Sequence, residues 1–315
     1  MTSETGFPTQ TVRMRGPLSG WLLFALSKVL GEVIAPGLGT SLGLKRAIAK
    51  NRAAGTARPG RMLRRRFVFR EELDMGEPVF YLSPKDSDPV STHFLYLHGG
   101  AFVLDMQSIQ WSMPAGLLDH VPNSDVTLPI YPLAPESSWR ETMSFVVAIY
   151  EKMVGRYGAE NIVVCGDSAG GTLSILLAQA IRDRGGPQPA SVVLFSPLLD
   201  GSASADDQPA LERRSASIPI SLIRNCIAMW APDLDPKDPR ISALYGSQQD
   251  LAPILVFSGD REVLDSDARR LALINPNVDH RSYAEMGHVF PIGGIREGRH
   301  AFEQAAIFIG QNVPR

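Results

Sequence analysis

Short apolar runs alternate with longer amphipathic stretches from residue 93 to the end of the chain. The apolar runs are rich in β-branched residues and stop at glycine or proline, which is typical of buried strands. The stretches between them repeat apolar residues every three or four positions, which is typical of helices that bury one face. This pattern predicts strands at 93–100, 125–131, 161–165, 191–200, 252–260 and 278–285, and helices at 108–119, 139–156, 172–181, 220–230, 264–273 and 297–311.

Two further strand-like runs, 64–73 and 76–83, precede this region and are joined by a short turn. Strands joined in this way pair antiparallel, whereas strands separated by helices pair in parallel. The pattern therefore predicts an α/β fold with a mostly parallel central sheet of about eight strands, flanked by helices.

Two segments add no strand to this predicted sheet. Residues 1–54 have a helical pattern from residue 17 onward, and residues 205–245 have one predicted helix and no strand signal. Ligands of parallel sheets bind beyond the carboxyl ends of the strands. We therefore expect residues 1–315 to form a single domain in which 1–54 and 205–245 make a helical cap over that edge.

The stretch from Trp21 to Val33 is amphipathic. Lys28 and Glu32 lie four residues apart on one face of the predicted helix, opposite a stripe of apolar residues. The uninterrupted apolar run, from Trp21 to Leu26, is too short to span a bilayer. We expect this helix to pack on the body of the protein, with attachment to a membrane surface as the alternative.

Composition narrows the class of protein without changing the predicted fold. Of 315 residues, 44% are apolar and 20% are charged, which fits a soluble globular domain with a large core. The formal net charge of −2 gives no indication of a nucleic-acid partner. Cys165 and Cys226 are too few for a disulfide framework or a metal cluster, which fits a reducing compartment, so we expect a cytoplasmic protein. A homodimer is a further expectation for its partners.

A serine between glycines interrupts the segment NIVVCGDSAGGTLSILLAQA, residues 161–180. The contiguous β-branched residues before Ser168 predict a buried strand, and the apolar stripe after it predicts a helix. A strand, a sharp turn through G-x-S-x-G and a helix together make a nucleophile elbow. A second match to this motif, GTSLG at 39–43, has no strand before it, so we expect Ser41 to lie in a loop.

A nucleophilic serine needs a base and an acid that orients the base, and in this layout they follow in the order serine, acid, histidine. The histidines after Ser168 are His280 in a predicted strand, His288 in the loop AEMGHVF and His300 in the last predicted helix. The loop position favours His288 as the base.

The acid is expected just after the strand 252–260, in the segment SGDREVLDSD. This segment offers Asp260, Glu262 and Asp265, and spacing alone does not choose among them. Carboxylates at a helix start are also common as solvated charges, because they complement the helix dipole.

The expected donors to an oxyanion are main-chain amides. One is the amide after the nucleophile, at Ala169, and the others lie in HGGA after the strand that begins at residue 93. The predicted oxyanion hole therefore consists of Gly99, Gly100, Ala101 and Ala169.

Taken together, HGGAF, YPLAPE, GDSAGG, SPLLD, SGDREVLDSD and GHVF resemble, in this order, the motifs of the hormone-sensitive lipase family of α/β-hydrolase carboxylesterases. The resemblance spans roughly residues 90–310 and implies an α/β-hydrolase catalytic domain with a helical cap and no cofactor or metal. The family's acid usually reads Asp-x-Leu, and Glu262 matches this register with Glu in place of Asp. The resemblance thus favours Glu262 as the acid, with Asp260 and then Asp265 as alternatives.

The chain departs from the family's motifs at three places. Ala101 stands where glycine is usual, Pro132 where arginine is common, and SSWRET follows Glu136 in place of Pro-Phe-Pro-Ala. None of these changes removes a catalytic group, although Ala101 is expected to narrow the site near the oxyanion hole.

These observations predict a serine carboxylesterase that hydrolyses short- to medium-chain acyl esters through Ser168, Glu262 and His288. Its partner is a small-molecule ester. A lactone, carbamate or formamide hydrolase with the same three residues is the alternative, because fold and triad do not fix a substrate. A non-catalytic ligand-binding protein of this fold typically lacks a triad member, and here serine, acid and histidine are all present.

Overall fold

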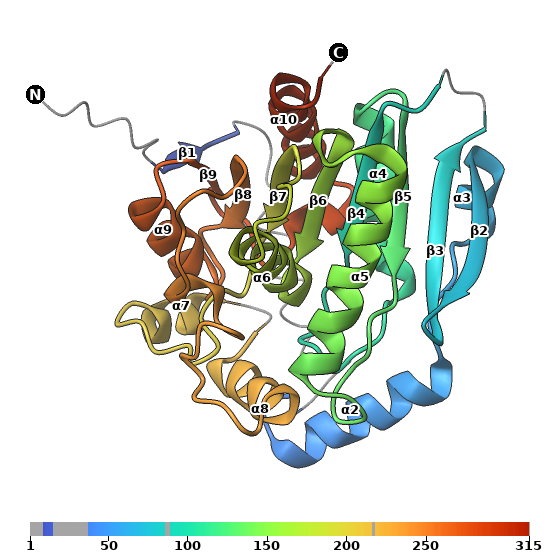
Figure 1. Ribbon diagram of the computed structural model, residues 1–315. Coiled ribbons are helices and arrows are strands. Elements are labelled where there is room, and N and C mark those ends of the chain that lie inside the picture. Colours follow the sequence, from blue (N-terminus) through green and yellow to red (C-terminus); the bar gives the residue numbers. More distant parts are fainter. Residues whose placement is uncertain (1–8, 15–36, 86–88, 216–217, 315) are drawn as a thin grey trace, which may run out of the picture.

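The computed structural model describes residues 9–14, 37–85, 89–215 and 218–314. Its centre is a twisted sheet of nine strands in the order β1-β9-β8-β7-β6-β4-β5-β3-β2 (Figure 1). β3 pairs antiparallel with both β2 and β5, and the other neighbours pair in parallel. The strands are β1 Gln10–Val12, β2 Phe67–Asp74, β3 Glu77–Pro84, β4 Thr92–Leu97, β5 Ser124–Pro129, β6 Ile162–Asp167, β7 Ser191–Phe195, β8 Ile254–Gly259 and β9 Val278–Tyr283.

The mostly parallel sheet flanked by helices, as predicted from the sequence, is confirmed. The strand missing from the prediction is β1, which pairs with β9 at one edge of the sheet. Its three residues are too few to show an alternating pattern, and they are exposed or half-buried.

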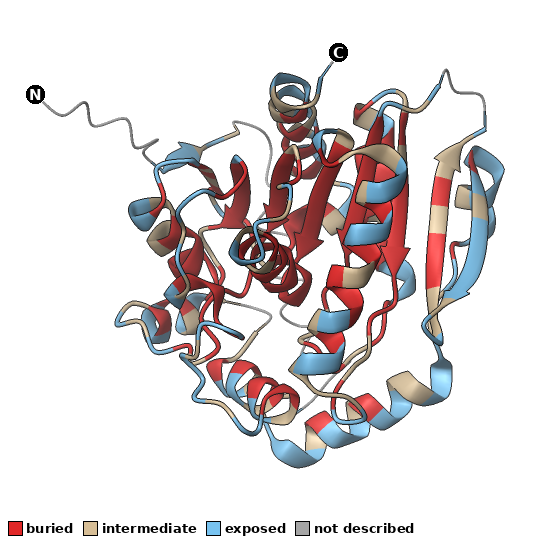
Figure 2. Ribbon diagram, in the orientation of Figure 1, coloured by how far each residue is buried: buried red, intermediate tan, exposed pale blue. Residues whose placement is uncertain are grey.

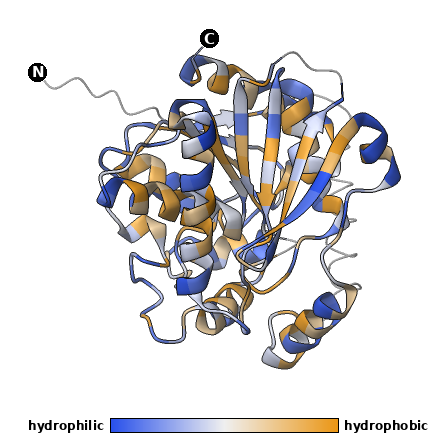
Figure 3. Cartoon of the chain, turned by 45° about the vertical axis from the view of Figure 1, so that its right-hand side comes forward, coloured by the Kyte–Doolittle hydropathy of each residue, from blue (hydrophilic) through white to orange (hydrophobic). Residues whose placement is uncertain are grey.

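Helices cover both faces of the sheet, and Figure 1 labels them in chain order. Figure 3 shows hydrophobic and hydrophilic residues on different sides of their turns, as amphipathic helices require. The helices are α2 Ser41–Ala54, α3 Arg61–Arg66, α4 Ser112–His120, α5 Trp139–Tyr157, α6 Ala169–Asp183, α7 Gln208–Arg214, α8 Ile220–Trp230, α9 Asp265–Ile274 and α10 Arg296–Asn312, with short 3-10 turns η1 Ser108–Trp111, η2 Ala159–Asn161, η3 Ala243–Tyr245 and η4 Phe290–Gly293.

Alternation along the central strands divides the core into two layers, which Figure 2 shows as the buried interior. Leu95 and Val164 belong to the layer under α5, α6 and α9. Their neighbours Phe94 and Val163 belong to the layer under α4 and α10. Strands buried on both faces explain why these runs are continuously apolar in the sequence.

Two sequence predictions near the N-terminus are wrong. Ser41 is the first residue of α2 and does not lie in a loop, because Thr40 caps the helix by accepting a hydrogen bond from the Gly43 amide (3.1 Å). The strand predicted at 64–73 begins only at Phe67, because Arg61–Arg66 forms α3.

Figure 1 shows α2 and α8 beyond the carboxyl ends of the parallel strands, where the sequence predicts a cap. Leu44 of α2 and Ile223 of α8 are buried in the same core layer as the strands. The Asn225 side chain also donates to the Gly39 carbonyl (3.1 Å). The amphipathic stretch Trp21–Val33 lies outside the described residues, so the division of the cap into 1–54 and 205–245 stays a prediction. Within the described ranges, no helix is both long and apolar enough to cross a bilayer.

Candidate active site

Ser168 lies at the sharp turn between β6 and α6. Its backbone has φ 52° and ψ −117°, a conformation that residues other than glycine rarely adopt. Main-chain hydrogen bonds hold it from both sides: its amide donates to the Phe195 carbonyl (2.9 Å), and its carbonyl accepts from Gly171 (3.0 Å) and Leu198 (3.1 Å). The turn therefore has the strained geometry of a nucleophile elbow.

The glycines around Ser168 are required by close approaches of the backbone. A β-carbon at Gly166 would lie 2.3 Å from the Gly170 carbonyl oxygen, and one at Gly170 would lie 1.9 Å from that of Leu97. At Gly171, a β-carbon would lie 2.7 Å from the Pro197 side chain. Glycine at these positions lets α6 pack directly against β4 and the loop after β7.

Glu262 and His288 come together at the same edge of the sheet. Nδ1 of His288 lies 2.6 Å from Oε2 of Glu262. Because an ionised carboxylate only accepts, this contact places a proton on Nδ1 and leaves Nε2 free to take one. The other oxygen of Glu262 accepts from the Gly259 amide (2.8 Å), and the side chain is 1% exposed.

The alternative acids have other partners. The carboxylate of Asp260 accepts from the Glu285 amide (2.7 Å), and burial raises the pKa of Asp260. The carboxylate of Asp265 accepts from the hydroxyls of Ser258 (2.6 Å) and Ser282 (2.9 Å). Neither contact involves the predicted base, so the geometry favours Glu262 over both aspartates.

Ser196 is a site residue that the sequence reasoning did not single out. Its hydroxyl donates to Oε1 of Glu262 (2.7 Å) and accepts from the amide of Val289 (2.9 Å), the residue after His288. It thus joins the predicted acid to the loop that carries the predicted base. Ser196 begins the motif SPLLD, but nothing in that motif indicates a contact with Glu262.

Strand order brings the nucleophile and the base to one place. β6, β7, β8 and β9 are successive neighbours in the sheet, and the residues concerned follow β6, β8 and β9. Among the described residues, no hydrogen bond joins Ser168 to His288. Such contacts often tighten only when substrate binds.

The loop after β4 has an unusual backbone. Gly100, Ala101 and Phe102 have successive positive φ values of 139°, 53° and 65°. A β-carbon at Gly100 would lie 2.3 Å from the Leu104 carbonyl oxygen, so glycine is required there. The Gly99 amide donates to the Asp167 carboxylate (3.0 Å), which removes Gly99 from the set of predicted oxyanion donors.

The remaining predicted donors are available. In the described part of the chain, the amides of Gly100, Ala101 and Ala169 have no hydrogen-bond acceptor. Ala169 is the first residue of α6, where amides have no partner within the helix and the helix dipole favours negative charge.

Asp167 links the elbow to this loop and was also missed. Its buried carboxylate accepts from the Tyr96 hydroxyl (2.6 Å) and from the Gly99 amide. Burial raises the pKa of Asp167, and the hydrogen bond from Tyr96 opposes that shift. The residue stands directly before Ser168 in GDSAGG, and no local pattern in this motif indicates its contacts.

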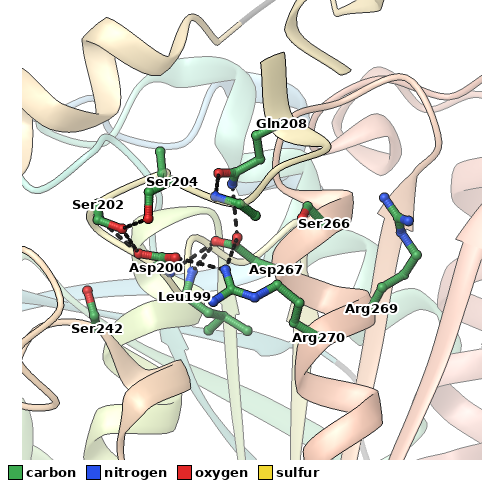
Figure 4. A network of polar contacts seen from close by, with 12 residues as sticks. Leu199, Asp200, Ser202, Ser204, Gln208, Ser242, Ser266, Asp267, Arg269 and Arg270 are labelled. Atoms are coloured by element: carbon green, nitrogen blue, oxygen red, sulfur yellow. Dashed lines mark hydrogen bonds and ion pairs between the residues drawn. The ribbon is translucent and has the colours of Figure 1, made fainter. Parts of the chain in front are cut away.

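Figure 4 shows a polar network around Asp200 and Asp267. Asp267 of α9 accepts from the amides of Leu199 (2.9 Å) and Asp200 (3.0 Å) and from the Gln208 side chain (3.1 Å). Burial, and next the charge of Asp200, raise the pKa of Asp267 to about 7. Arg270 binds Asp200 (2.8 Å). The network ties the loop after β7 to α7 and to the helix that follows Glu262.

The other predicted residues lie elsewhere. His280 is buried in β9, with Nε2 2.7 Å from the Ser258 hydroxyl, and His300 contacts the Tyr283 hydroxyl (2.8 Å). Cys165 and Cys226 are unpaired and buried. No cluster of three or more potential metal ligands occurs among the described residues.

The chain is similar to known proteins in both sequence and structure. A family model described as alpha/beta hydrolase fold matches residues 94–292, which is more than half of the chain. The chain belongs to the alpha/beta hydrolase family. This hydrolase is 31% identical to an acetyl-hydrolase of Streptomyces hygroscopicus over 225 residues, which cover 68% of this chain and 74% of the relative. It is also 31% identical to a triacylglycerol lipase of Mycobacterium tuberculosis, but the match covers 61% of this chain and only 39% of the lipase.

A solved structure of similar fold is an esterase from the bacterial hormone-sensitive lipase family. Its TM-score is 0.74 at 26% identity, and the match covers 87% of this hydrolase and 99% of that chain. The resemblance to the hormone-sensitive lipase family, predicted from the motifs, is thus confirmed. The hydrolase belongs with the serine ester hydrolases, the enzyme class that its sequence predicts.

Proposed function

We propose that this hydrolase is a carboxylesterase that cleaves short- to medium-chain acyl esters, with Ser168 as nucleophile, His288 as base and Glu262 as acid. The observation that carries the proposal is the buried contact between Nδ1 of His288 and Glu262, at the edge of the sheet where Ser168 stands in its strained turn. A base oriented by a buried carboxylate, at the same sheet edge as a serine in a sharp turn, is the arrangement that acyl transfer needs.

In the proposed reaction, Oγ of Ser168 attacks the ester carbonyl while Nε2 of His288 takes its proton. The amides of Gly100, Ala101 and Ala169 stabilise the oxyanion of the tetrahedral intermediate. His288 then gives the proton to the leaving alcohol as the carbon–oxygen bond breaks. Water, activated by the same nitrogen, releases the acid from the acyl-enzyme.

The size of the acyl group is inferred from one local feature and from the relatives. Ala101 adds a methyl group at the oxyanion loop, which narrows the space beside the reacting carbonyl. Two relatives are named for the esters that they cleave, an acetyl-hydrolase and a triacylglycerol lipase. The narrowed loop and the acetyl-hydrolase relative support acyl groups of short to medium length.

The test is a panel of acetate, butyrate and octanoate esters together with lactones and amides. Ser168→Ala should abolish turnover of every accepted substrate, and a fluorophosphonate should label Ser168. Ser41→Ala is the matched control, because Ser41 occupies the other G-x-S-x-G match and lies exposed at the start of α2. Near-normal ester cleavage by Ser168→Ala would contradict the proposal, and a higher kcat/KM for lactones than for esters would change the substrate class.

A further inference from the structure

The oxyanion loop, residues 99–105, has a strained backbone. Three successive residues have positive φ, and two of them, Ala101 and Phe102, carry side chains. Left-handed conformations cost about 1–2 kcal/mol for such residues and persist only where the surroundings hold them. The loop therefore depends on contacts at both of its ends.

The end of the loop next to β4 is held from within the catalytic body. The Gly99 amide binds Asp167, and the Gly99 carbonyl accepts from the Gln110 side chain (3.2 Å). The Gly100 carbonyl accepts from the amides of Val103 (3.1 Å) and Leu104 (2.8 Å), which closes the turn. These contacts fix the beginning of the loop. None of them holds Asp105, where the loop ends.

The exit is held by α2. The carboxamide of Asn51 pairs with the main chain of Asp105 as a strand would: Oδ1 accepts from the Asp105 amide (2.7 Å), and Nδ2 donates to its carbonyl (3.4 Å). Thr56 donates to the Asp105 carboxylate, which also accepts from the Met106 amide (2.6 Å). The Ala57 amide adds a bond to the Met106 carbonyl (3.2 Å).

We propose that Asn51 is a positioning residue for the oxyanion hole: by fixing both main-chain groups of Asp105, it holds the amides of Gly100 and Ala101 where the oxyanion forms. The inference deepens the proposed esterase function and rests on it. Oxyanion donors act only when they are held within a fraction of an ångström of the productive geometry. Asn51 touches neither substrate nor reacting atoms, so its effect reaches the reaction through the loop.

The test compares Asn51→Ala with wild type and with Lys50→Ala, an exposed neighbour on the same helix. Alanine is a better helix former than asparagine, so α2 itself should persist. Active sites are counted by fluorophosphonate titration, so that kcat refers to folded enzyme. We expect Asn51→Ala to lower kcat by about 10- to 100-fold, because small displacements of a catalytic group have effects of this size, with KM changed less than about 3-fold.

A trifluoromethyl ketone supplies the readout that a purely structural role would not change. Ser168 adds to its carbonyl and His288 takes the proton, which leaves an oxyanion in the hole. The inhibition constant of this ketone should rise in Asn51→Ala by the same factor as kcat falls, and Lys50→Ala should change neither. If kcat per active site is unchanged, or falls without any loss of ketone affinity, the inference is overturned.

If Asn51→Ala does not fold, a second variant tests the inference. Asn51→Asp keeps an acceptor for the Asp105 amide but replaces the donor to its carbonyl with an oxygen that repels it, so it should lower kcat and ketone affinity together. Unchanged values in this variant would overturn the inference and leave the proposed function intact. A wild type without Ser168-dependent ester cleavage would overturn both.

Discussion

At the scale of single residues, backbone strain gathers around the candidate site. Ten described residues other than glycine have positive φ, and five of them belong to the site or its loops: Ala101, Phe102, Ser168, Ser196 and Val289. Each such residue costs on the order of 1–3 kcal/mol and persists only where its surroundings hold it. The bond between the Val289 amide and the Ser196 hydroxyl shows how two strained residues hold each other.

The backbone strain at Ala101 can be relieved by a single substitution, to glycine. Its φ of 53° is accessible to glycine without a steric cost, and glycine is usual here in the resembling family. Ala101→Gly should stabilise the protein by about 0.5–1 kcal/mol, once the larger entropy that glycine loses on folding is subtracted. Urea unfolding of both proteins checks this, and a destabilised glycine variant would contradict it.

The choice of acid gives a second prediction at this scale. Glu262→Gln should lower kcat by up to about 10⁴-fold, because a neutral amide neither orients the base nor stabilises its imidazolium form. Asp260→Asn should cost much less, since Asp260 binds the Glu285 amide. Steady-state kinetics on butyrate esters compare the two variants, and the reverse order of losses would reassign the acid to Asp260.

The sequence predicts the residues with distinctive local patterns better than those that act through distant contacts. Ser168 and His288 stand in a strand–turn–helix and a glycine-marked loop, which local patterns can indicate. Ser196 contacts Glu262, which lies 66 positions further along the chain, and Asp167 contacts Gly99, which lies 68 positions before it. No local pattern in a sequence indicates contacts at such separations. The sequence predicts Gly99 as an oxyanion donor, whereas its amide binds Asp167, because a sequence cannot show which way an amide points.

At the scale of elements, β9 is tied to its neighbours by a buried histidine. Nε2 of His280 lies 2.7 Å from the Ser258 hydroxyl of β8, and Nδ1 lies 3.2 Å from the Thr9 hydroxyl just before β1. Because the Ser258 proton goes to Asp265, His280 donates from Nε2 and accepts at Nδ1. Both ring nitrogens are therefore used by the neutral form.

This arrangement predicts a dependence of stability on pH. Burial lowers the pKa of His280 to about 4, although the Asp265 charge partly opposes the shift. In the unfolded chain the pKa of His280 has its ordinary value of about 6.5. Between pH 4 and pH 6.5 the unfolded state therefore binds a proton at His280 that the folded state does not. The stabilisation from neutral His280 is thus complete above pH ~6.5 and is lost as pH falls toward 4, by about 3 kcal/mol.

Denaturant unfolding of wild type and His280→Gln between pH 4 and 8 measures this effect. The variant lacks the titrating ring, so its free energy of unfolding should fall less steeply between pH 6.5 and 4 than that of wild type. Parallel curves for the two proteins over this range would show that His280 does not contribute.

At the scale of the whole molecule, an aromatic contact joins the proposed cap to the catalytic body. The ring of Trp230, the last residue of α8, stacks on Phe102 of the oxyanion loop with centroids 3.8 Å apart and planes 3° apart. Its indole nitrogen donates to Thr142 of α5 (3.1 Å), and the side chain is fully buried. α8 is therefore packed into the core and is not a detached flap.

Trp230→Ala should accordingly destabilise the whole protein and not only the cap. The lost packing and the cavity left behind predict a decrease of about 3–5 kcal/mol in the free energy of unfolding. Trp139→Ala is the matched control, because Trp139 is only half-buried and should cost less than half as much. Chemical denaturation followed by circular dichroism compares them, and equal losses would contradict the docking role of Trp230.

The pairing of β1 with β9 also orders events during synthesis. Thr9 and His280, which contact each other beside this pair, are separated by 271 residues. A ribosome adding roughly 5–20 residues per second needs on the order of 15–55 s to make the stretch between them. The sheet can assemble around β4 to β8 in the meantime, whereas β1 waits as an unpaired segment until β9 emerges. β1 is thus made before the other described strands but is placed only after β9 has been made, so this edge of the sheet is completed after its centre.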